Sequence, residues 1–321
     1  MYDLRRLRAF HAVAQMGSFS AAGLELGYAQ SVVSHHVAAL EREFGLTLVN
    51  RGTRPVSITD AGTRLLRHAE AVLGHVTAAE DELRAIAGLQ GGTLRVGAFL
   101  SACNSFLPPA LARFEQEHPD VTVSFEQLEE PEALRRIRSG GLDLAVVWRI
   151  PGFPAPGGET RDEGIDQLHL VDDPYLVVLP TKHRLARRRH IRLTELADER
   201  FTAPAAAGHA LPYREMLDRL CVEAGFEPRI HQAEDVTVGR AIIAAGLGVG
   251  LLSELTMPEP RPDIALRPPR DISPYRSIHA TWLRGRRVPA VSRMVRYLAD
   301  AAGARLGGGR ERATPDDFHD D

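Results

Sequence analysis

The segment from Ser18 to Arg51 constrains the fold more than any other part of the chain. A short helical pattern covers residues 20–26, a glycine and a tyrosine interrupt it, and a longer helical pattern begins at about Gln30. Two helices joined by a short turn that contains glycine form a helix-turn-helix, which sets its second helix into the major groove of DNA. The segment therefore predicts a DNA-binding domain.

A helix before this segment and a strand pattern after it complete the domain. The first helix is expected over residues 4–15, and Ser18 stands where its side-chain oxygen can cap the second helix. Residues 46–58 have the pattern of a two-stranded wing, with its turn at residues 51–55. We therefore expect a mostly α-helical N-terminal domain with a winged helix-turn-helix fold.

The charge of the chain is unevenly distributed. Residues 1–67 contain eight arginines and five acidic residues, a net charge near +3, whereas the whole chain carries −3. The remaining residues therefore carry a net charge near −6. A basic domain on an acidic body suits phosphate binding at one end, although a chance fluctuation on a solvated surface would give the same numbers.

A long amphipathic helix is expected after Thr59, which stands at the position of an N-cap. Its apolar residues are spaced alternately by four and three, which is typical of a heptad seam packed against a partner helix. An amphipathic helix packed on its own domain is the alternative. Residues 88–92 are rich in glycine and predict a hinge. The seam consists of Leu65, Ala69, Val72, Val76, Ala79, Leu83 and Ile86.

Strand and helix patterns alternate beyond the hinge, which favours an α/β fold with a parallel sheet covered on both faces. A late strand at 276–283 could return to the first set of these units. Residues 303–321 are glycine-rich, then acidic, and predict disorder. Further strand patterns cover residues 93–97, 121–126, 142–148, 175–179 and 246–252.

The composition excludes several classes of protein. No run of 18 apolar residues exists, so we expect no membrane span. The first ten residues carry arginines and an aspartate where a secretory signal would need an apolar core, so we expect a cytoplasmic protein. Two cysteines, Cys103 and Cys221, cannot form a disulfide framework and are expected to be reduced.

Two sets of residues carry a resemblance to a known family. The N-terminal set is Phe10, Ser18, Phe19, Ala21, Ala22, Leu26, Gln30, Ser34, Leu40, Glu41, Gly45, Leu48, Arg51, Thr59, Ala61 and Gly62. The looser C-terminal set is Gly97, Leu107, Pro108, Phe114, Pro119, residues 141–145, Asp173, Pro174, His183, residues 224–228 and residues 246–248. With these residues the chain resembles the LysR-type transcriptional regulators over residues 4–300. The resemblance implies a winged helix-turn-helix, a dimerising linker helix and a two-lobed effector domain similar to periplasmic binding proteins.

Two positions depart from that family. Its members usually open the recognition helix with Ser-Gln-Pro, whereas this chain has Ala29, Gln30 and Ser31. Ala29 has no side-chain oxygen for a cap, and a lost N-cap costs about 1 kcal/mol. Ser31 has a hydroxyl and could take over part of the capping role. Val49 stands where phenylalanine is usual, and this smaller apolar residue should leave the wing intact.

Side chains at the start of the recognition helix and on the wing are the candidate DNA contacts. Gln30 can pair with both hydrogen-bonding groups of an adenine edge, while serines can contact either base type and a histidine a guanine or a phosphate. The wing arginines should meet phosphates and fix the register, although a structural ion pair is the alternative for Arg51. The candidate set is Ser18, Gln30, Ser31, Ser34, His35, Arg51 and Arg54.

The resemblance also implies a small-molecule effector between the two lobes. Strand-end loops and helix N-termini line such a cleft, and their free backbone N–H groups favour an anionic effector. Helix capping is the alternative role for each of the candidate contacts, chiefly for Ser101 and Thr202. The candidate effector contacts are Ser101, Asn104, Phe201, Thr202 and Asp235.

We expect a regulator that binds double-stranded DNA at an inverted repeat as a homodimer or homotetramer. RNA polymerase would be a further partner if the protein activates transcription. No cofactor or metal is expected, because the adjacent His35 and His36 lack the spacing of a zinc pair on a helix.

The sequence is expected to divide into four parts. These are a DNA-binding domain at 1–60, a linker helix and hinge at 61–91, an effector domain at 92–302 and a disordered tail at 303–321. Within the effector domain, lobe I is expected at 92–166 and 266–302, and lobe II at 167–265.

Three alternatives compete with parts of this interpretation. An enzyme or small-molecule-binding protein on the α/β part would need a nucleophile-base set, a phosphate loop or metal spacing, and none is present in the sequence. A redox sensor would use Cys103, whose thiol pKa a helix N-terminus could lower. Residues 187–189, three consecutive arginines, are interpreted as a solvated loop, with a second DNA-binding patch as the alternative.

Overall fold

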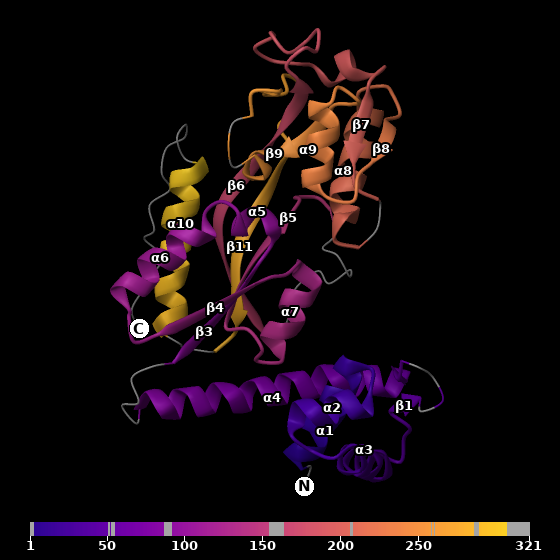
Figure 1. The fold of residues 1–321 in the computed structure, drawn as a ribbon, viewed down its shortest axis with the longest axis vertical. Coiled ribbons are helices and arrows are strands. Elements are labelled where there is room, and N and C mark those ends of the chain that lie inside the picture. The colour runs from indigo at the N-terminus through magenta and orange to yellow at the C-terminus, as the bar shows by residue number, and fades with distance from the viewer. Residues whose placement is uncertain are drawn as a thin grey trace. The chain divides into compact units, whose positions relative to one another are not determined.

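The computed structural model describes residues 3–50, 52, 55–86, 92–153, 164–205, 208–257, 259, 261–285 and 289–306. They form two compact units (Figure 1). The first unit comprises Met1–Gly92 with Leu134–Asp143, and the second comprises Thr93–Ala133 with Leu144–Asp321. No described helix is both long and apolar enough to cross a lipid bilayer.

The first unit begins with three helices, as the sequence predicts: α1 (Leu4–Met16), α2 (Phe19–Leu26) and α3 (Gln30–Phe44). The predicted cap on α2 is confirmed, because the Ser18 hydroxyl oxygen accepts a hydrogen bond from the Ala21 amide at 3.3 Å. The helices enclose an apolar core. Its fully buried members include Phe10, Val13, Ala22, Val33, Val37 and Leu40.

A small wing and a long helix follow. Strands β1 (Val49–Asn50) and β2 (Ser57–Ile58) pair in antiparallel fashion, which confirms the predicted wing. Helix α4 (Asp60–Ile86) comes next, and Thr59 caps it by accepting a hydrogen bond from the Gly62 amide at 3.0 Å. In the predicted heptad seam Ala69 is buried, whereas Val72 and Leu83 are 43% and 65% exposed. The outer part of the seam is therefore open to a partner helix.

The second unit is built on a seven-stranded sheet with the order β10-β6-β11-β5-β3-β4, and β9 pairs with β6. Two helices, α6 (Leu107–Glu117) and α10 (Pro289–Leu306), pack together on one side of its first half (Figure 1). The seven strands of this sheet are β3 (Thr93–Ala98), β4 (Thr122–Gln127), β5 (Leu144–Arg149), β6 (Ile165–Pro180), β9 (Gly250–Ser253), β10 (Ile264–Arg267) and β11 (Tyr275–Leu283). Strands β7 (Arg200–Ala203) and β8 (Arg229–Gln232) pair in a separate parallel sheet. The remaining helices of this unit are α5 (Leu100–Cys103), α8 (Leu211–Glu223) and α9 (Val236–Ala244), with 3-10 turns at Leu193–Leu196, Gly208–Ala210 and Glu254–Thr256. Helix α7 (Glu130–Arg138) begins in this unit, and its residues from Leu134 onward belong to the first unit.

The sheet is mixed, which corrects the prediction of a parallel sheet. Strands β3, β4 and β5 are parallel as expected, but β11 is antiparallel to both β5 and β6. The late strand does return to the first set of strands, and its direction is reversed because it runs back along the long strand β6. Together β6 and β11 link the two halves of the unit (Figure 1).

Each half has its own apolar core, which defines two lobes. Lobe I surrounds Phe99, Phe106 and Phe114, and α10 adds Met294 and Leu298 to it. The core of lobe II consists mainly of Val177, Leu193, Leu196, Phe201, Met216, Leu217, Cys221 and Leu251. Helix α10 continues through Leu306, so residues 303–306 of the predicted disordered tail are helical. The helix extends this far because its apolar face packs on lobe I. Residues 307–321 of that tail lie outside the described residues.

Candidate functional site

Helix α3 presents an uncharged edge at its N-terminal end. Gln30 is its first residue and is exposed, as are Ser31 and His35, while Ser34 is half-buried. The opposite side of the helix holds Val33 with no exposed surface. The uncharged edge is therefore available to a partner, and the apolar side fixes the helix to the domain.

The entry to α3 differs from a side-chain-capped helix. Ala29 is its N-cap, in an extended conformation, and no side chain caps the helix there, so the suggestion that Ser31 takes over the cap is wrong. The turn before it is fixed by the backbone instead, because the Tyr28 amide donates to the Gly23 carbonyl at 2.8 Å. A Cβ at Gly23 would lie 2.7 Å from the backbone carbonyl oxygen of Tyr28, so only glycine permits this close approach of the turn to α2.

The other candidate DNA contacts are placed less completely. Ser18 is half-buried and its oxygen is engaged in the α2 cap. Arg51 and Arg54 lie outside the described residues. Sequence reasoning missed two exposed side chains near the uncharged edge, Tyr28 and Val32, which are 41% and 39% exposed. Val32 carried a signal in the sequence, because it is an apolar residue off the buried face of α3, whereas Tyr28 lies in the turn before that helix.

A cavity of about 370 Å³ lies within the second unit and is lined by both lobes. Its volume is in the range of small-molecule binding sites. Four aromatic side chains form much of its wall: Phe99, Trp148, Tyr175 and Tyr213. The rings of Tyr175 and Tyr213 stack at 5.8 Å, and the Tyr213 hydroxyl donates to the Leu251 carbonyl at 3.0 Å. Burial raises the pKa of both phenols, so they are neutral hydrogen-bonding groups.

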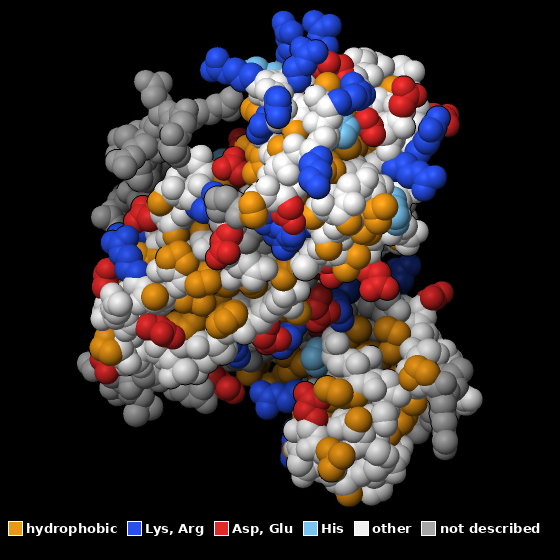
Figure 2. Space-filling model, turned by 45° about the horizontal axis from the view of Figure 1, so that its top comes forward, with side chains coloured by type: hydrophobic (Ala, Val, Ile, Leu, Met, Phe, Trp, Pro, Cys, Tyr) orange, Lys and Arg blue, Asp and Glu red, His pale blue; other side chains and the backbone are white. Residues whose placement is uncertain are grey.

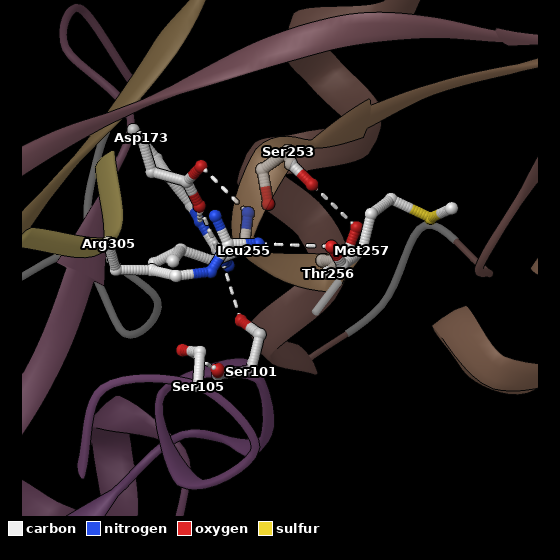
Figure 3. A network of polar contacts seen from close by, with 9 residues as sticks. Ser101, Ser105, Asp173, Ser253, Leu255, Thr256, Met257 and Arg305 are labelled. Atoms are coloured by element: carbon white, nitrogen blue, oxygen red, sulfur yellow. Dashed lines mark hydrogen bonds and ion pairs between the residues drawn. The ribbon is translucent and has the colours of Figure 1, made fainter. Parts of the chain in front are cut away.

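A buried ion pair between Asp173 and Arg276 lies at this cavity, which Arg276 lines. Figure 3 shows Asp173, Ser101 and Leu255 of the network around it. The Arg276 guanidinium on β11 contacts the Asp173 carboxylate on β6 at 2.8 Å and donates to the Ser101 hydroxyl at 2.6 Å. Asp173 also accepts from the Leu255 amide at 3.1 Å. The guanidinium carbon stands 4.9 Å from the centre of the Phe99 ring. The network thus joins both crossing strands to α5 and to the turn after β9.

Three of the five predicted effector contacts line the cavity: Ser101, Thr202 and Asp235. Asn104 is the C-cap of α5 and is exposed to solvent outside the cavity lining. Phe201 is fully buried in the core of lobe II. Phe201 points away from the cavity lining because successive residues of a strand face opposite sides, so its neighbour Thr202 takes the cavity side.

The capping alternative holds for Asp235 and not for Ser101. The Asp235 carboxylate accepts hydrogen bonds from the Thr237 and Val238 amides at 2.7 and 2.8 Å, and so it caps α9. Ser101 lies inside α5 and accepts from Arg276. The Thr202 hydroxyl has no hydrogen-bond partner in the described part of the chain, and neither does that of Ser253, which also lines the cavity.

The thiol pKa of Cys103 is raised, whereas the redox alternative required it to be lowered by a helix N-terminus. This residue ends the short helix α5 instead of beginning it, and burial raises its pKa to about 11. Burial likewise raises the pKa of Cys221 to about 12, and this residue belongs to the core of lobe II. Both thiols are therefore protonated near neutral pH.

The arginine run at 187–189 is exposed on lobe II. Figure 2 shows lysine and arginine side chains gathered over this end of the second unit. The placement agrees with the solvated-loop interpretation.

Sequence reasoning missed several polar and aromatic residues of the cavity, among them Arg276, Ser253, Trp148, Tyr175 and Tyr213. Arg276 carried a signal, because an arginine at the start of a strand destined for burial needs an acidic partner. Its partner Asp173 lies 103 positions away in the sequence, and no local pattern connects the two.

Two protein-family models match the chain. Residues 4–63 match the model described as bacterial regulatory helix-turn-helix protein, lysR family, and residues 87–303 match the model described as LysR substrate binding domain. Among curated relatives, the HTH-type transcriptional regulator ShiR of Corynebacterium glutamicum is 34% identical over 260 residues, which cover 79% of this chain and 83% of ShiR. CbbR of Rhodospirillum rubrum is 31% identical over 256 residues, which cover 79% of this chain and 80% of CbbR.

Solved structures share the fold. Full-length OxyR from Pseudomonas aeruginosa matches with a TM-score of 0.72 at 21% identity, covering 95% of this chain and 96% of OxyR. Full-length CbnR in complex with its target DNA matches with a TM-score of 0.61 at 23% identity, covering 94% of this chain and all of CbnR (100%).

Proposed function

The chain belongs to the LysR family of bacterial transcriptional regulators, and from this premise we propose how its own residues carry out regulation. The uncharged edge of α3, led by Gln30, reads base edges in the major groove of an inverted-repeat operator. Two copies joined along α4, or four in a tetramer, present this edge to the operator's half-sites. The protein acts in the cytoplasm, and as an activator it would contact RNA polymerase.

The single observation that carries this proposal is the exposure of Gln30, Ser31 and His35 at the start of a helix whose other side is anchored in the core. Uncharged side chains with paired hydrogen-bond donors and acceptors suit the reading of base edges. Phosphate contacts carry no sequence information and do not require such matched pairs. The exposed Tyr28 and Val32 would add apolar contacts, for example with thymine methyl groups.

A gel shift with the intergenic DNA upstream of the protein's own gene tests the proposal. We expect a discrete complex at moderate salt that survives an excess of unrelated DNA. Equal competition by unrelated DNA would contradict sequence-specific recognition.

Changing Gln30 to alanine tests the role of the uncharged edge. Loss of one bidentate base contact should lower the discrimination between operator and mismatched DNA by about 5- to 150-fold, since such a contact contributes about 1–3 kcal/mol. Gln167→Ala is the matched control, because Gln167 is exposed on β6 in the other unit. Fluorescence anisotropy with both DNAs measures the ratio. Equal ratios for the two variants would exclude Gln30 from base readout.

The effector would bind in the cavity between the lobes. A ligand there changes DNA binding only if it binds one arrangement of the lobes more tightly than another. Strands β6 and β11 are the elements that connect the lobes, so the buried network at Asp173 and Arg276 is where such a change would be transmitted.

A cysteine-based redox response is the second candidate, because one similar structure is a full-length OxyR. The two thiols argue against it, since their pKa values of about 11 and 12 leave almost no reactive thiolate at neutral pH. We expect millimolar peroxide to leave operator affinity unchanged, and intact-mass measurement to show both thiols unmodified. A peroxide-dependent change in affinity that Cys103→Ser abolishes would establish the redox role.

A further inference from the structure

The charges around the cavity indicate which class of molecule it accepts. We infer that the effector is an aromatic compound whose polar group is uncharged or basic, and not a carboxylate. This inference rests on the proposed function of the cavity as the effector site. It departs from the anionic effector that the sequence favoured.

The first observation is that the cavity has no free positive charge among its described lining residues. Arg276 is the one lysine or arginine among them, and its guanidinium already contacts Asp173 at 2.8 Å. Asp173 is fully buried and Arg276 nearly so, which leaves the pair close to neutral as seen from the cavity. A ligand carboxylate entering here would find no uncompensated cation to replace its hydration.

The second observation is that carboxylates line the same cavity. Glu129 contributes from lobe I, and Glu234 and Asp235 contribute from lobe II. Like charges brought together during binding cost free energy, so this lining disfavours an anion and favours a neutral or positively charged group.

The third observation concerns the N-terminus of α9, which is one of the helix N-termini at the cavity. At α9 the amides of Thr237 and Val238 already donate to the Asp235 carboxylate. The protein's own side chain thus fills the position that a ligand carboxylate would otherwise take.

The remaining lining describes the body of the ligand. Phe99, Trp148, Tyr175 and Tyr213 offer ring surfaces for an aromatic group. The buried hydroxyls of Thr202 and Ser253 have no partner within the described residues, although buried polar groups are normally hydrogen-bonded. A ligand amide, hydroxyl or amine could supply the missing partner.

A matched series of ligands separates the charge classes. For phenyl, naphthyl and indolyl bodies, the carboxylate, the carboxamide and the primary amine would be compared at neutral pH by thermal shift and by calorimetry on the full chain. We expect the amide or the amine of at least one body to bind at least about tenfold more tightly than its carboxylate. The inference is overturned if the carboxylate binds as tightly or more tightly, or if no amide or amine binds.

Two variants test the assignment of residues. Thr202→Val should weaken the best amide or amine by about 2- to 10-fold, as expected for one lost hydrogen bond, while leaving the melting temperature without ligand unchanged because the hydroxyl is unpartnered there. Thr194→Val is the control, since Thr194 is exposed away from the cavity lining. Glu129→Gln should reduce the preference for amine over amide. Unchanged ligand affinities in both Thr202→Val and Glu129→Gln would contradict the assignment.

The gel shift without ligand distinguishes this inference from the function on which it rests. Specific DNA binding together with tight carboxylate binding would overturn the effector class alone. Loss of specific DNA binding would overturn the proposed function, whatever the ligand series shows.

Discussion

Replacing Asp173 by alanine is expected to destabilise the second unit by about 3–5 kcal/mol, because it leaves the Arg276 guanidinium buried without its counter-charge. The carboxylate is fully buried and also accepts the Leu255 amide, so two hydrogen bonds are lost together. Thermal unfolding of the full chain, followed by circular dichroism, should show the transition of the second unit at a much lower temperature.

Two further variants separate the buried pair from ordinary surface charge. Asp166→Ala breaks an ion pair with Arg284 whose side chains are 40% and 62% exposed, and such exposed pairs contribute at most about 1 kcal/mol. The double variant Asp173→Ala with Arg276→Met removes both charges and should recover part of the loss. If Asp173→Ala unfolds at the same temperature as Asp166→Ala, the buried pair does not have the stabilising role described here.

Replacing Gly62 by alanine is expected to destabilise the DNA-binding unit by about 1–3 kcal/mol, the usual cost of forcing an extra methyl group into a packed site. A Cβ at Gly62 would overlap the carbonyl oxygen of Leu48, next to the wing strand β1. The first turn of α4 would have to move away from the wing. We therefore also expect weaker operator binding, because the wing changes position relative to α3.

Gly303→Ala is the control for this substitution. Gly303 lies inside α10, and a Cβ there would meet no atom within 4 Å. Alanine in such a helical position should leave stability unchanged or raise it by about 0.5–1 kcal/mol. Urea denaturation of both variants measures the difference. A Gly62→Ala protein as stable as Gly303→Ala would show that α4 does not pack closely on the wing.

Features set by local sequence were the ones that could be predicted. The cap at Thr59, the cap at Ser18 and the helix ends follow from residues within one helical turn of each other. The alternation of strands and helices likewise gave the α/β class of the second unit. These patterns depend on residues close together in the sequence, so they can be recognised without knowledge of the tertiary contacts.

Features that depend on distant contacts could not be predicted. The direction of β11 is set by its pairing with β5 and β6, far earlier in the chain. The pairing of Asp173 with Arg276, and the choice of Thr202 over Phe201 for the cavity side, arise only when the strands are assembled. The raised pKa of Cys103 has the same origin, because burial by other elements outweighs its position near a helix end.

The most direct test of the account is a competition measurement of the full chain on its own upstream DNA at physiological salt. Fluorescence anisotropy would compare that DNA with a shuffled sequence of equal length and composition. A specific regulator should bind its operator at least about a thousandfold more tightly than shuffled DNA, and Gln30→Ala should reduce this ratio. Equal affinity for the two DNAs, in the wild-type protein, would contradict the claim that the uncharged edge of α3 reads bases.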